Sequence, residues 1–593
     1  MPSNRRFWHT FLGCSAISVV YLILGWFHWR LVLVPAKPDE VAHLEYIVDI
    51  LDGRFWPVMK KEISPCLDER NQPPLYYWVS AAVMQFTPTR DLGKWYTANP
   101  FFMVGAPRGN GAACLHFPQV NSLLMTGRIL SWLLGTLTIW GTYRAMRVWL
   151  GPSSSMLITA LVVLTPSITF VQTGINNMAL FIPINVMIFG ELSRIWKFGM
   201  TRKRMLRGII LLILGTYTRM EALLWWIPAG VILFRAIRRG VSIRSVTPYA
   251  AALASAISPL LLRNMLLYGD PFVHSAHSSR SPVPLSHWIQ AELPMLLRML
   301  FVSLGQGFIS APDYVYVLIA IVLLTGVSGV VLRALRRDLP SGVWLMLSHF
   351  SVLVLASVLL SLRYFVGAPR YIGAAGISGA AVWAIGYEGV WPRSIRRYAL
   401  AATLVVWYFL HTIAITQVLI PVYTPRPAAR SDHPVAILDG KILLHRAWIQ
   451  PVYAKPGETI VVRLVWEALE PVPGNLAVFV HALDPEAPVI VAQEDTYPLY
   501  GNYPTMLWVP HQPFEDVHHI RLPGDLTVPC LRLTAGLYYY ETMERLPAFS
   551  PNGKRFHGGG SDAIPIGQVF LVSRPEAPWS SSGTQGVCPS TAP

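Results

Sequence analysis

Repeated apolar runs of about 20 residues constrain this chain more than any other feature of its sequence. A helix of that length crosses the roughly 30 Å hydrocarbon core of a bilayer. Only 13% of the 593 residues are charged, whereas an average soluble domain has about 25%. The sequence therefore predicts a polytopic α-helical membrane protein and excludes an ordinary soluble enzyme. The runs cover residues 11–34, 121–146, 154–171, 178–195, 208–234, 246–267, 314–332, 343–362, 372–391 and 399–420.

Short clusters of Arg and Lys between the runs predict the orientation, because positive loops stay in the cytoplasm. All clusters fall on one side only if the run 208–234 enters and leaves on that side as two short helices. We expect its break near Arg219 and Glu221, which gives about eleven spans, a cytoplasmic N-terminus and an extracytoplasmic C-terminal domain in the cell membrane. The first run lacks a small-residue cleavage site, so we interpret it as an anchor rather than a cleaved signal. The clusters are Arg5/Arg6, Arg144/Arg147, Arg194 to Arg207, Arg235 to Arg244, Arg333/Arg336/Arg337 and Arg393/Arg396/Arg397.

Charge divides the chain near Thr424. Residues 1–424 have 36 Lys and Arg against 16 Asp and Glu, whereas residues 425–593 have 12 against 16. Because the positive excess lies in loops between apolar runs, it does not indicate a nucleic-acid partner. We expect a membrane domain over 1–424 with large outer loops at 35–120 and 268–312, and an extracytoplasmic domain over 425–575. Residues 576–593, rich in Ser, Gly, Thr and Pro, are typical of a disordered tail.

The second domain has short β-type runs at 460–466, 476–481, 536–541 and 568–572, separated by Pro-Gly pairs. Short strands at this spacing predict an all-β sandwich. Aromatic and acidic residues over 495–508 are typical of carbohydrate-binding loops, but aromatic packing at the edge of the sandwich explains them equally well. An oxidising exterior permits disulfides, and each outer region has one pair of cysteines. The pairs are Cys66 with Cys114 and Cys530 with Cys588.

The first outer loop is acidic, since nine of the sixteen acids of residues 1–424 lie between Asp39 and Asp91. It opens with Asp39, Glu40 and His43 directly after the first span, at the depth of the lipid headgroups. Pro38 and these acids suit the first turn of a capped amphipathic helix. Residues four apart also share one face of a helix. Asp39 and His43 therefore form a compact constellation that capping does not require.

A second motif, residues 71–78, reads Asn-Gln-Pro-Pro-Leu-Tyr-Tyr-Trp and precedes an apolar stretch too short to span a membrane. We expect a surface or re-entrant helix that is entered through a rigid Pro-Pro elbow. Its aromatic residues fit either an interfacial belt or a platform for a substrate.

These motifs recur in a recognisable order along the eleven spans. They are Asp39-Glu40 with His43, then Gln72-Pro73-Pro74-Leu75-Tyr76-Tyr77, then Arg263-Asn264 with Tyr268-Gly269-Asp270-Pro271, and Arg370-Tyr371 at the start of the tenth span. Over most of residues 20–424 the chain resembles the GT-C superfamily of polytopic glycosyltransferases, which includes protein O-mannosyltransferases and the aminoarabinose transferases that modify lipid A. The resemblance implies inverting transfer of a sugar from a polyprenyl-phosphate donor, on the outer face of the membrane, to a lipid, glycan or protein acceptor.

Such a reaction needs a base for the acceptor hydroxyl and a cation for the leaving phosphate. A carboxylate within hydrogen-bond reach can take the proton, and Arg binds phosphate oxygens with its forked guanidinium. Adjacent helical residues point about 100° apart, so we favour Asp39 over Glu40 as the base. The substrate-binding candidates are His43, Gln72, Tyr76, Arg219, Arg263, Arg370 and Tyr371. For the arginines, contact with outer headgroups or a buried structural pair between Arg219 and Glu221 remain alternative interpretations.

The short turn after the third span departs from the pattern of the superfamily. Many relatives have an acidic residue there, whereas this chain has Asn176-Asn177. An amide adds no charge for a divalent cation, so we assign no metal ligand and expect no required cofactor. His43, Glu45, His274 and His277 leave room for a divalent cation at another place in the loops.

Two other functions fit the same composition. One is a transporter or flippase for lipid-linked glycans, although we find no repeated halves, no acid in the middle of a span and no polar pattern in the span interiors. The other is a non-catalytic membrane anchor for a carbohydrate-binding sandwich.

Overall fold

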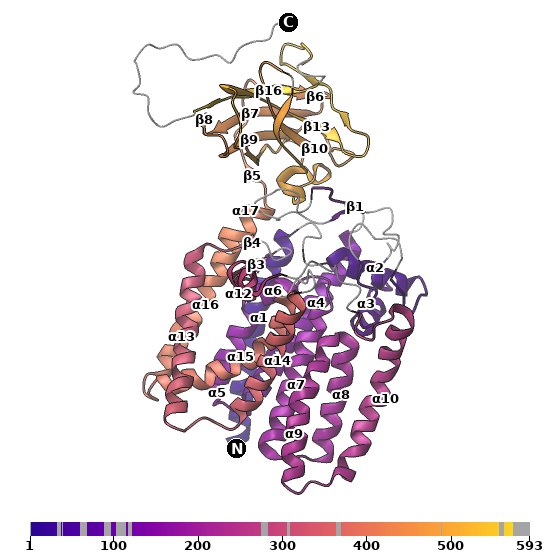
Figure 1. Ribbon diagram of the computed structural model, residues 1–593, viewed down its shortest axis with the longest axis vertical. Helices are drawn as coiled ribbons and strands as arrows, with labels where there is room; N and C mark the ends of the chain where they lie inside the picture. Colours follow the sequence, from indigo (N-terminus) through magenta and orange to yellow (C-terminus); the bar gives the residue numbers. More distant parts are fainter. Residues whose placement is uncertain are drawn as a thin grey trace. The chain divides into compact units, whose positions relative to one another are not determined.

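A computed structural model shows a bundle of helices followed by a β-domain (Figure 1). The chain divides into two compact units, one formed by residues 1–96 and 119–419 and the other by residues 97–118 and 420–593. The described residues are 2–32, 37, 39–59, 68–87, 96–101, 114–116, 121–273, 283–304, 309–362, 369–487, 489–556 and 562–572.

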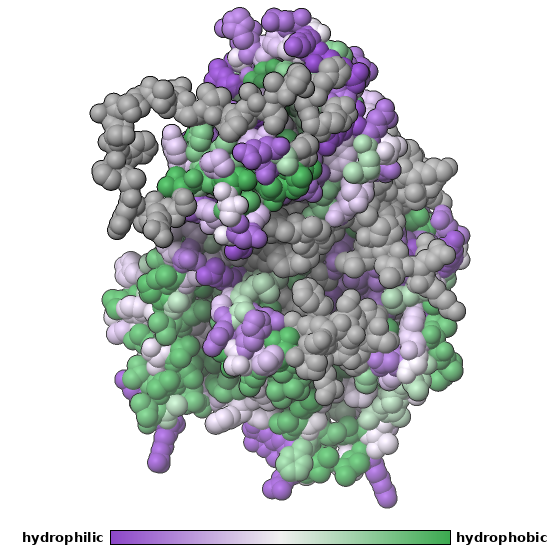
Figure 2. Space-filling view, turned by 45° about the horizontal axis from the view of Figure 1, so that its top comes forward, coloured by the Kyte–Doolittle hydropathy of each residue, from purple (hydrophilic) through white to green (hydrophobic). Residues whose placement is uncertain are grey.

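The first unit is a membrane domain. Within the described ranges, eight helices are long and apolar enough to cross a bilayer, and a ninth span is the bent pair α5–α6. Much of their surface is apolar and exposed (Figure 2), as expected for helices in lipid. The helices are α1 (Pro2–Leu31), α2 (Glu40–Leu51), α3 (Leu75–Met84), α4 (Asn121–Met146), α5 (Pro152–Val163), α6 (Pro166–Gln172), α7 (Met178–Phe198), α8 (Arg202–Thr218), η2 (Met220–Trp225), α9 (Trp226–Arg238), α10 (Ile243–Tyr268), α11 (Leu285–His287), η4 (Trp288–Glu292), α12 (Leu293–Val302), α13 (Asp313–Leu335), α14 (Gly342–Ser361), α15 (Pro369–Val390), α16 (Arg396–Ile413), η5 (Ala414–Leu419) and α17 (Ile420–Tyr423).

The predicted break in the run 208–234 is confirmed. Helix α8 ends at Thr218, Arg219 adopts an extended conformation with φ −154° and ψ 140°, and η2 and α9 lead back. The run 154–171 is not the single straight helix that its hydropathy suggests, because α5 and α6 meet at an angle of 64°. Pro166 begins α6 and Thr165 before it is extended. The ring of a proline disfavours the helical conformation of the preceding residue, which accounts for the bend.

The expectation that the span interiors lack a polar pattern is wrong. His28 and His411 face each other with their Nε2 atoms 3.0 Å apart. The Gln172 amide donates to the Thr138 hydroxyl at 2.7 Å, and His349 Nδ1 lies 2.8 Å from Ser378 Oγ. Buried polar groups are costly unless they are paired. These pairs join different helices, namely α1 with α16, α4 with α6 and α14 with α15.

Helices α2 and α3 of the loop 35–120 fold onto α4 and the start of α7. Their shared apolar cluster includes Ile47, Tyr77, Met84, Leu123 and Ala179, all with exposed fractions of 0%. Full burial of one such large side chain contributes about 1.5–3 kcal/mol. The acidic loop is therefore a packed part of the membrane domain, and it holds its polar residues in defined positions.

The C-terminal unit is the predicted β-sandwich. One sheet has the strand order β11-β10-β13-β16-β8, with β14 paired to β13, and the other has the order β15-β6-β7-β9-β12-β5. Alternate residues of the central strands β9 and β13, such as Trp466 and Leu533, point into one core between the sheets. The strands are β5 (Arg426–Pro427), β6 (Ala436–Leu438), β7 (Ile442–Gln450), β8 (Tyr453–Ala454), β9 (Thr459–Ala468), β10 (Ala477–Leu483), β11 (Ile490–Thr496), β12 (Phe514–Arg521), β13 (Cys530–Tyr539), β14 (Glu544–Arg545), β15 (Ala548–Phe549) and β16 (Ile564–Leu571).

Aromatic residues of the predicted carbohydrate-binding loops pack inward. Tyr497, Tyr503 and Trp508 have exposed fractions of 0%, 7% and 4%, so for them packing at the edge of the sandwich is the correct interpretation. Phe101, from the segment of the first outer loop that folds with this unit, contacts Tyr497 and Tyr540.

The cysteine predictions are tested only in part. Cys530 is disulfide-bonded, while its predicted partner Cys588 lies outside the described residues. Cys66 also lies outside them, and Cys14 is a free, buried thiol.

Candidate active site

Asp39 and His43 lie one turn apart at the start of α2. Asp39 precedes the helix in a left-handed conformation, with φ 53° and ψ 24°. Asp visits this region more readily than most residues, yet such a conformation still costs of order 1–3 kcal/mol and is concentrated at functional sites. Asp39 is nearly buried, with an exposed fraction of 8%, and the His43 side chain one turn later is buried too.

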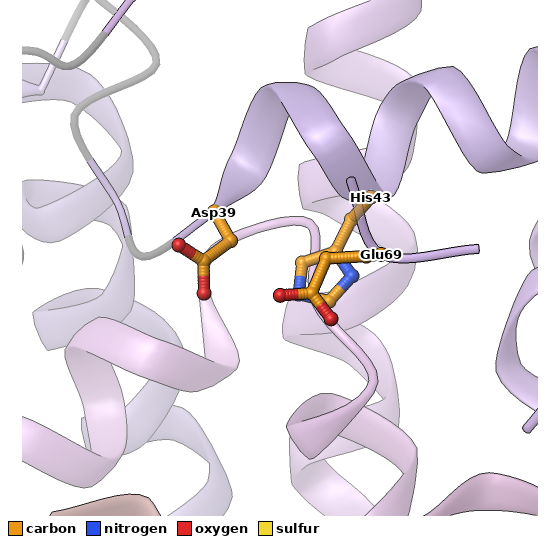
Figure 3. A group of neighbouring side chains, drawn as sticks. All are labelled: Asp39, His43 and Glu69. Atoms are coloured by element: carbon orange, nitrogen blue, oxygen red, sulfur yellow. The ribbon is translucent and has the colours of Figure 1, made fainter. Parts of the chain in front are cut away.

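Asp39, His43 and Glu69 form one cluster (Figure 3), whose potential ligand atoms all lie within 4.8 Å of one another. The predicted pairing of Asp39 with His43 is thus present. Glu69 was missed, because it lies 30 residues further along the chain, just before the Pro-Pro elbow. The only sequence signal for Glu69 was its position two residues before Asn71, where the motif 71–78 begins. The His43 ring is oriented by Tyr77, whose hydroxyl lies 2.8 Å from Nδ1.

The Glu40 carboxylate is bound by an arginine and is not part of the cluster of Asp39, His43 and Glu69. Arg128 of α4 donates to both of its carboxylate oxygens at 2.7 and 2.6 Å, and the Ile175 backbone N–H donates at 3.0 Å. Burial alone would raise the pKa of Glu40, but the Arg128 guanidinium outweighs it and holds the pKa below its usual value. A carboxylate held ionised in this way is a weak proton acceptor. Glu40 therefore joins α2 to α4 and to the turn before α7.

The turn Asn176-Asn177, where many relatives have an acidic residue, is part of a hydrogen-bond network. The Asn177 amide donates to Gln72 Oε1 at 3.2 Å, and its oxygen accepts from Arg219 Nη1 at 2.5 Å. Arg219 also forms the predicted ion pair with Glu221. One chain of hydrogen bonds thus connects the elbow before α3, the turn before α7 and the tip of the α8–α9 hairpin.

The remaining predicted residues are distributed more widely. The Tyr76 hydroxyl forms a hydrogen bond with the Ser131 hydroxyl at 2.9 Å. The tyrosine beside the acidic cluster is its neighbour Tyr77. Arg263 of α10 lies over the Trp56 ring at 4.6 Å and donates to the Pro57 carbonyl at 2.7 Å, which anchors the chain that follows α2.

Arg370 and Tyr371 lie in the first turn of α15. Their side chains are outside the described part of the structure. Glu45, proposed above as one of four possible metal ligands, forms an ion pair with Arg70 at 3.1 Å. The other two loop histidines of that set, His274 and His277, lie outside the described residues.

A cavity of about 650 Å³ opens beside the acidic cluster. Its volume is typical of a ligand site. His43, Asn176, Asn185 and Arg219 line its polar part, whereas most of the remaining wall is apolar and comes from α5, α6, α7 and α12 to α16. Such a cavity suits an amphipathic ligand with a long apolar chain and an anionic head.

Comparisons with known proteins give one kind of match. No protein-family model matches the sequence, and no curated protein matches it. The chain is similar to several proteins of known structure. They include ArnT from Cupriavidus metallidurans in the apo state, at 13% identity and a TM-score of 0.41 over 65% of this chain and 62% of that one. The Archaeoglobus fulgidus oligosaccharyltransferase tethered with an acceptor peptide follows at 11% identity and a TM-score of 0.41, over 68% and 55%.

The Saccharomyces cerevisiae Pmt1–Pmt2 O-mannosyltransferase complex bound to the sugar donor matches at 14% identity with a TM-score of 0.32, over 44% and 34%. This chain thus spans less than two thirds of the length of each of these structures. At such low scores the likeness carries no weight for function. The function proposed below is supported by the acidic cluster and the cavity.

Proposed function

We propose that the protein is a membrane glycosyltransferase that moves a sugar from a polyprenyl-phosphate donor to an acceptor hydroxyl on the outer face of the membrane. The supporting observation is the cavity itself, because it joins a long apolar wall to His43 and Arg219 beside the buried Asp39. A lipid-linked sugar has the same order of parts: an apolar chain, an anionic phosphate and a polar sugar.

Arg219 is the cation best placed for the donor phosphate among the described residues that line the cavity. Its guanidinium is held by Glu221 and Asn177, so it is oriented before the donor arrives. Pre-oriented charge stabilises a developing anion without reorganisation during the reaction. Arg370 remains a second proposed phosphate ligand.

The proposed reaction has one displacement step. The acceptor oxygen attacks the anomeric carbon as its proton passes to the Asp39 carboxylate. The bond from the anomeric carbon to the phosphate oxygen breaks, and the lipid phosphate leaves with the electron pair. Attack from the side opposite the phosphate inverts the anomeric carbon. The acceptor is a lipid, a glycan or a protein.

The acidic cluster also fits a divalent cation. Two carboxylates and one imidazole are a common ligand set for such ions. Here Asp39 and His43 are buried, Glu69 is half-buried, and their potential ligand atoms lie within 4.8 Å of one another. A bound cation would supply positive charge near the leaving phosphate. Metal analysis of the purified protein before and after chelation, compared with a Glu69→Gln variant, tests this site without an activity measurement.

The function is tested by incubating the purified protein with a panel of polyprenyl-phosphate sugars. Release of polyprenyl phosphate that depends on an added acceptor supports the proposal. Movement of labelled donor across a proteoliposome membrane without release of the lipid phosphate would instead identify a lipid-linked glycan transporter. If neither release of the lipid phosphate nor movement of the donor occurs, and Asp39→Asn still binds glycan, the protein is a non-catalytic membrane anchor for the β-sandwich.

A further inference from the structure

Two turns of the membrane domain, far from the acidic cluster in sequence, carry a high density of cations. One joins α7 to α8 and the other joins α9 to α10 (Figure 1). Both are fully described. Together they form the basic patch, which consists of Lys197, Arg202, Lys203, Arg204, Arg207, Arg235, Arg238, Arg239 and Arg244.

One cation–π contact joins the two turns. The Arg235 guanidinium, near the end of α9, lies 4.0 Å from the centre of the Trp196 ring near the end of α7. Arg204 at the start of α8 reaches back to the Phe198 and Gly199 carbonyls at 2.9 and 2.8 Å. The cations of both turns thus belong to one surface.

Hardly any acid balances this surface. Between residues 192 and 269 the only acid is Glu221, at the other end of the α8–α9 hairpin. In the described part of the chain, Arg207 is the one member of the patch that pairs with a carboxylate, that of Glu191 at 3.0 Å. Arg202 and Lys203 stand at the positive end of α8, where a cation costs about 0.3–1 kcal/mol. An external anion would remove this cost.

Large apolar side chains protrude among the cations. Phe198, Leu206, Phe234 and Ile243 have exposed fractions of 56%, 54%, 59% and 62%. At the end of a membrane helix, apolar side chains enter the acyl region while Arg and Lys extend to the headgroups. A soluble acidic partner would match the charges and leave these apolar side chains in water, whereas a phospholipid matches both.

We propose that the basic patch binds anionic phospholipids, with headgroup phosphates held by side chains from both turns. Clusters of four to eight Lys and Arg next to membrane helices bind anionic headgroups by charge attraction. The acyl chains then pack on the exposed apolar residues of the same turns. This interaction is independent of the proposed sugar transfer.

The test compares two variants with equal loss of charge. The patch variant combines Arg202→Gln, Lys203→Gln, Arg238→Gln and Arg239→Gln, all at exposed positions. The control combines Arg336→Gln, Arg337→Gln, Arg393→Gln and Arg397→Gln, which are exposed in other turns. Lipids retained by each purified protein are counted by native mass spectrometry after exchange into phosphatidylglycerol or phosphatidylcholine with the same acyl chains.

The wild type and the control should prefer phosphatidylglycerol, and the patch variant should lose about 600-fold of that preference, since each of the four surface cations contributes about fivefold. The preference should weaken as salt is raised. Equal loss in both variants, or no preference in the wild type, would overturn the proposal. So would competition by soluble glycerol phosphate at the same concentration, because it would make the ligand a free phosphate. If the fourfold variant fails to fold, the double variant Arg238→Gln with Arg239→Gln, beside the α9–α10 turn, tests the same proposal with an expected loss of about 25-fold.

Discussion

Asp39 and Glu40 are neighbours in sequence, yet the structure predicts opposite consequences when each is replaced by its amide. Glu40→Gln removes the charge that balances Arg128, and both side chains have exposed fractions of 0%. Breaking a buried ion pair by removing one partner costs about 3–5 kcal/mol. Asp39→Asn keeps the shape of the side chain and removes its proton affinity, which costs about 10²- to 10⁴-fold in rate when the group is a general base.

Two measurements on the same preparations separate these effects. Thermal unfolding followed by the fluorescence of the 21 tryptophans reports stability, and release of polyprenyl phosphate reports turnover. We expect Asp39→Asn to unfold near the wild-type temperature and to be almost inactive. Glu40→Gln should unfold earlier, while the fraction that stays folded should keep most of its turnover.

A double variant checks the reasoning about the ion pair. Glu40→Gln with Arg128→Met removes both charges, so no unpaired buried charge is left, and it should unfold at a higher temperature than Glu40→Gln alone. Near wild-type turnover in Asp39→Asn would show that Asp39 is not the base. A stable but inactive Glu40→Gln would assign the base to Glu40 and refute its structural role.

Three further predictions concern packing, pH and the donor. A Cβ atom on Gly386 of α15 would lie 2.0 Å from a carbonyl oxygen of α13, so Gly386→Ala should destabilise the protein by about 1–3 kcal/mol; Gly230→Ala, which meets open space, should be near neutral in the same unfolding assay. Burial alone would lower the pKa of His518, but the carboxylates of Asp516 and Glu494 raise it to about 10. The folded state then binds more protons than the unfolded state above the ordinary pKa near 6.5, so stability should be fully present below that pH and fall as pH rises toward 10. His518→Gln should flatten this slope in unfolding curves between pH 6.5 and 9.5, and an unchanged slope would contradict the assignment. Most of the wall of the 650 Å³ cavity is apolar, so the first isoprenyl units of the donor should pack in it while the rest of a longer chain stays in lipid. KM should therefore improve with donor length while the cavity fills and change little beyond, and continued improvement to much longer donors would contradict this occupancy.

Local properties of the chain were sufficient for the membrane architecture and for the class of the second domain. Each span is recognisable because the transfer of apolar side chains into lipid is favourable residue by residue, wherever the helix ends up in the bundle. The break at Arg219 follows from the same transfer of side chains into lipid, since a charged pair cannot lie in the middle of a span. The bend at Thr165 was not predicted, although its cause is local, because Pro166 acts on the residue next to it.

The site depended on contacts that no local pattern contains. Asp39 and His43 share a turn of helix and were predictable together, whereas Glu69 reaches them only because the loop folds back over α2. Whether Glu40 is a base or a structural anchor was decided by Arg128, 88 residues further along the chain.

The sequence by itself thus determined the apolar spans, the hairpin at Arg219, the β-sandwich and the pairing of Asp39 with His43. Only the tertiary structure decided which carboxylate is bound by a guanidinium, which polar side chains pair inside the bundle, and where a cavity remains between helices. The physical reason is the range of the forces involved. Hydropathy and proline sterics act within a residue or a turn, while a buried charge takes its proton affinity from whichever helix packs against it.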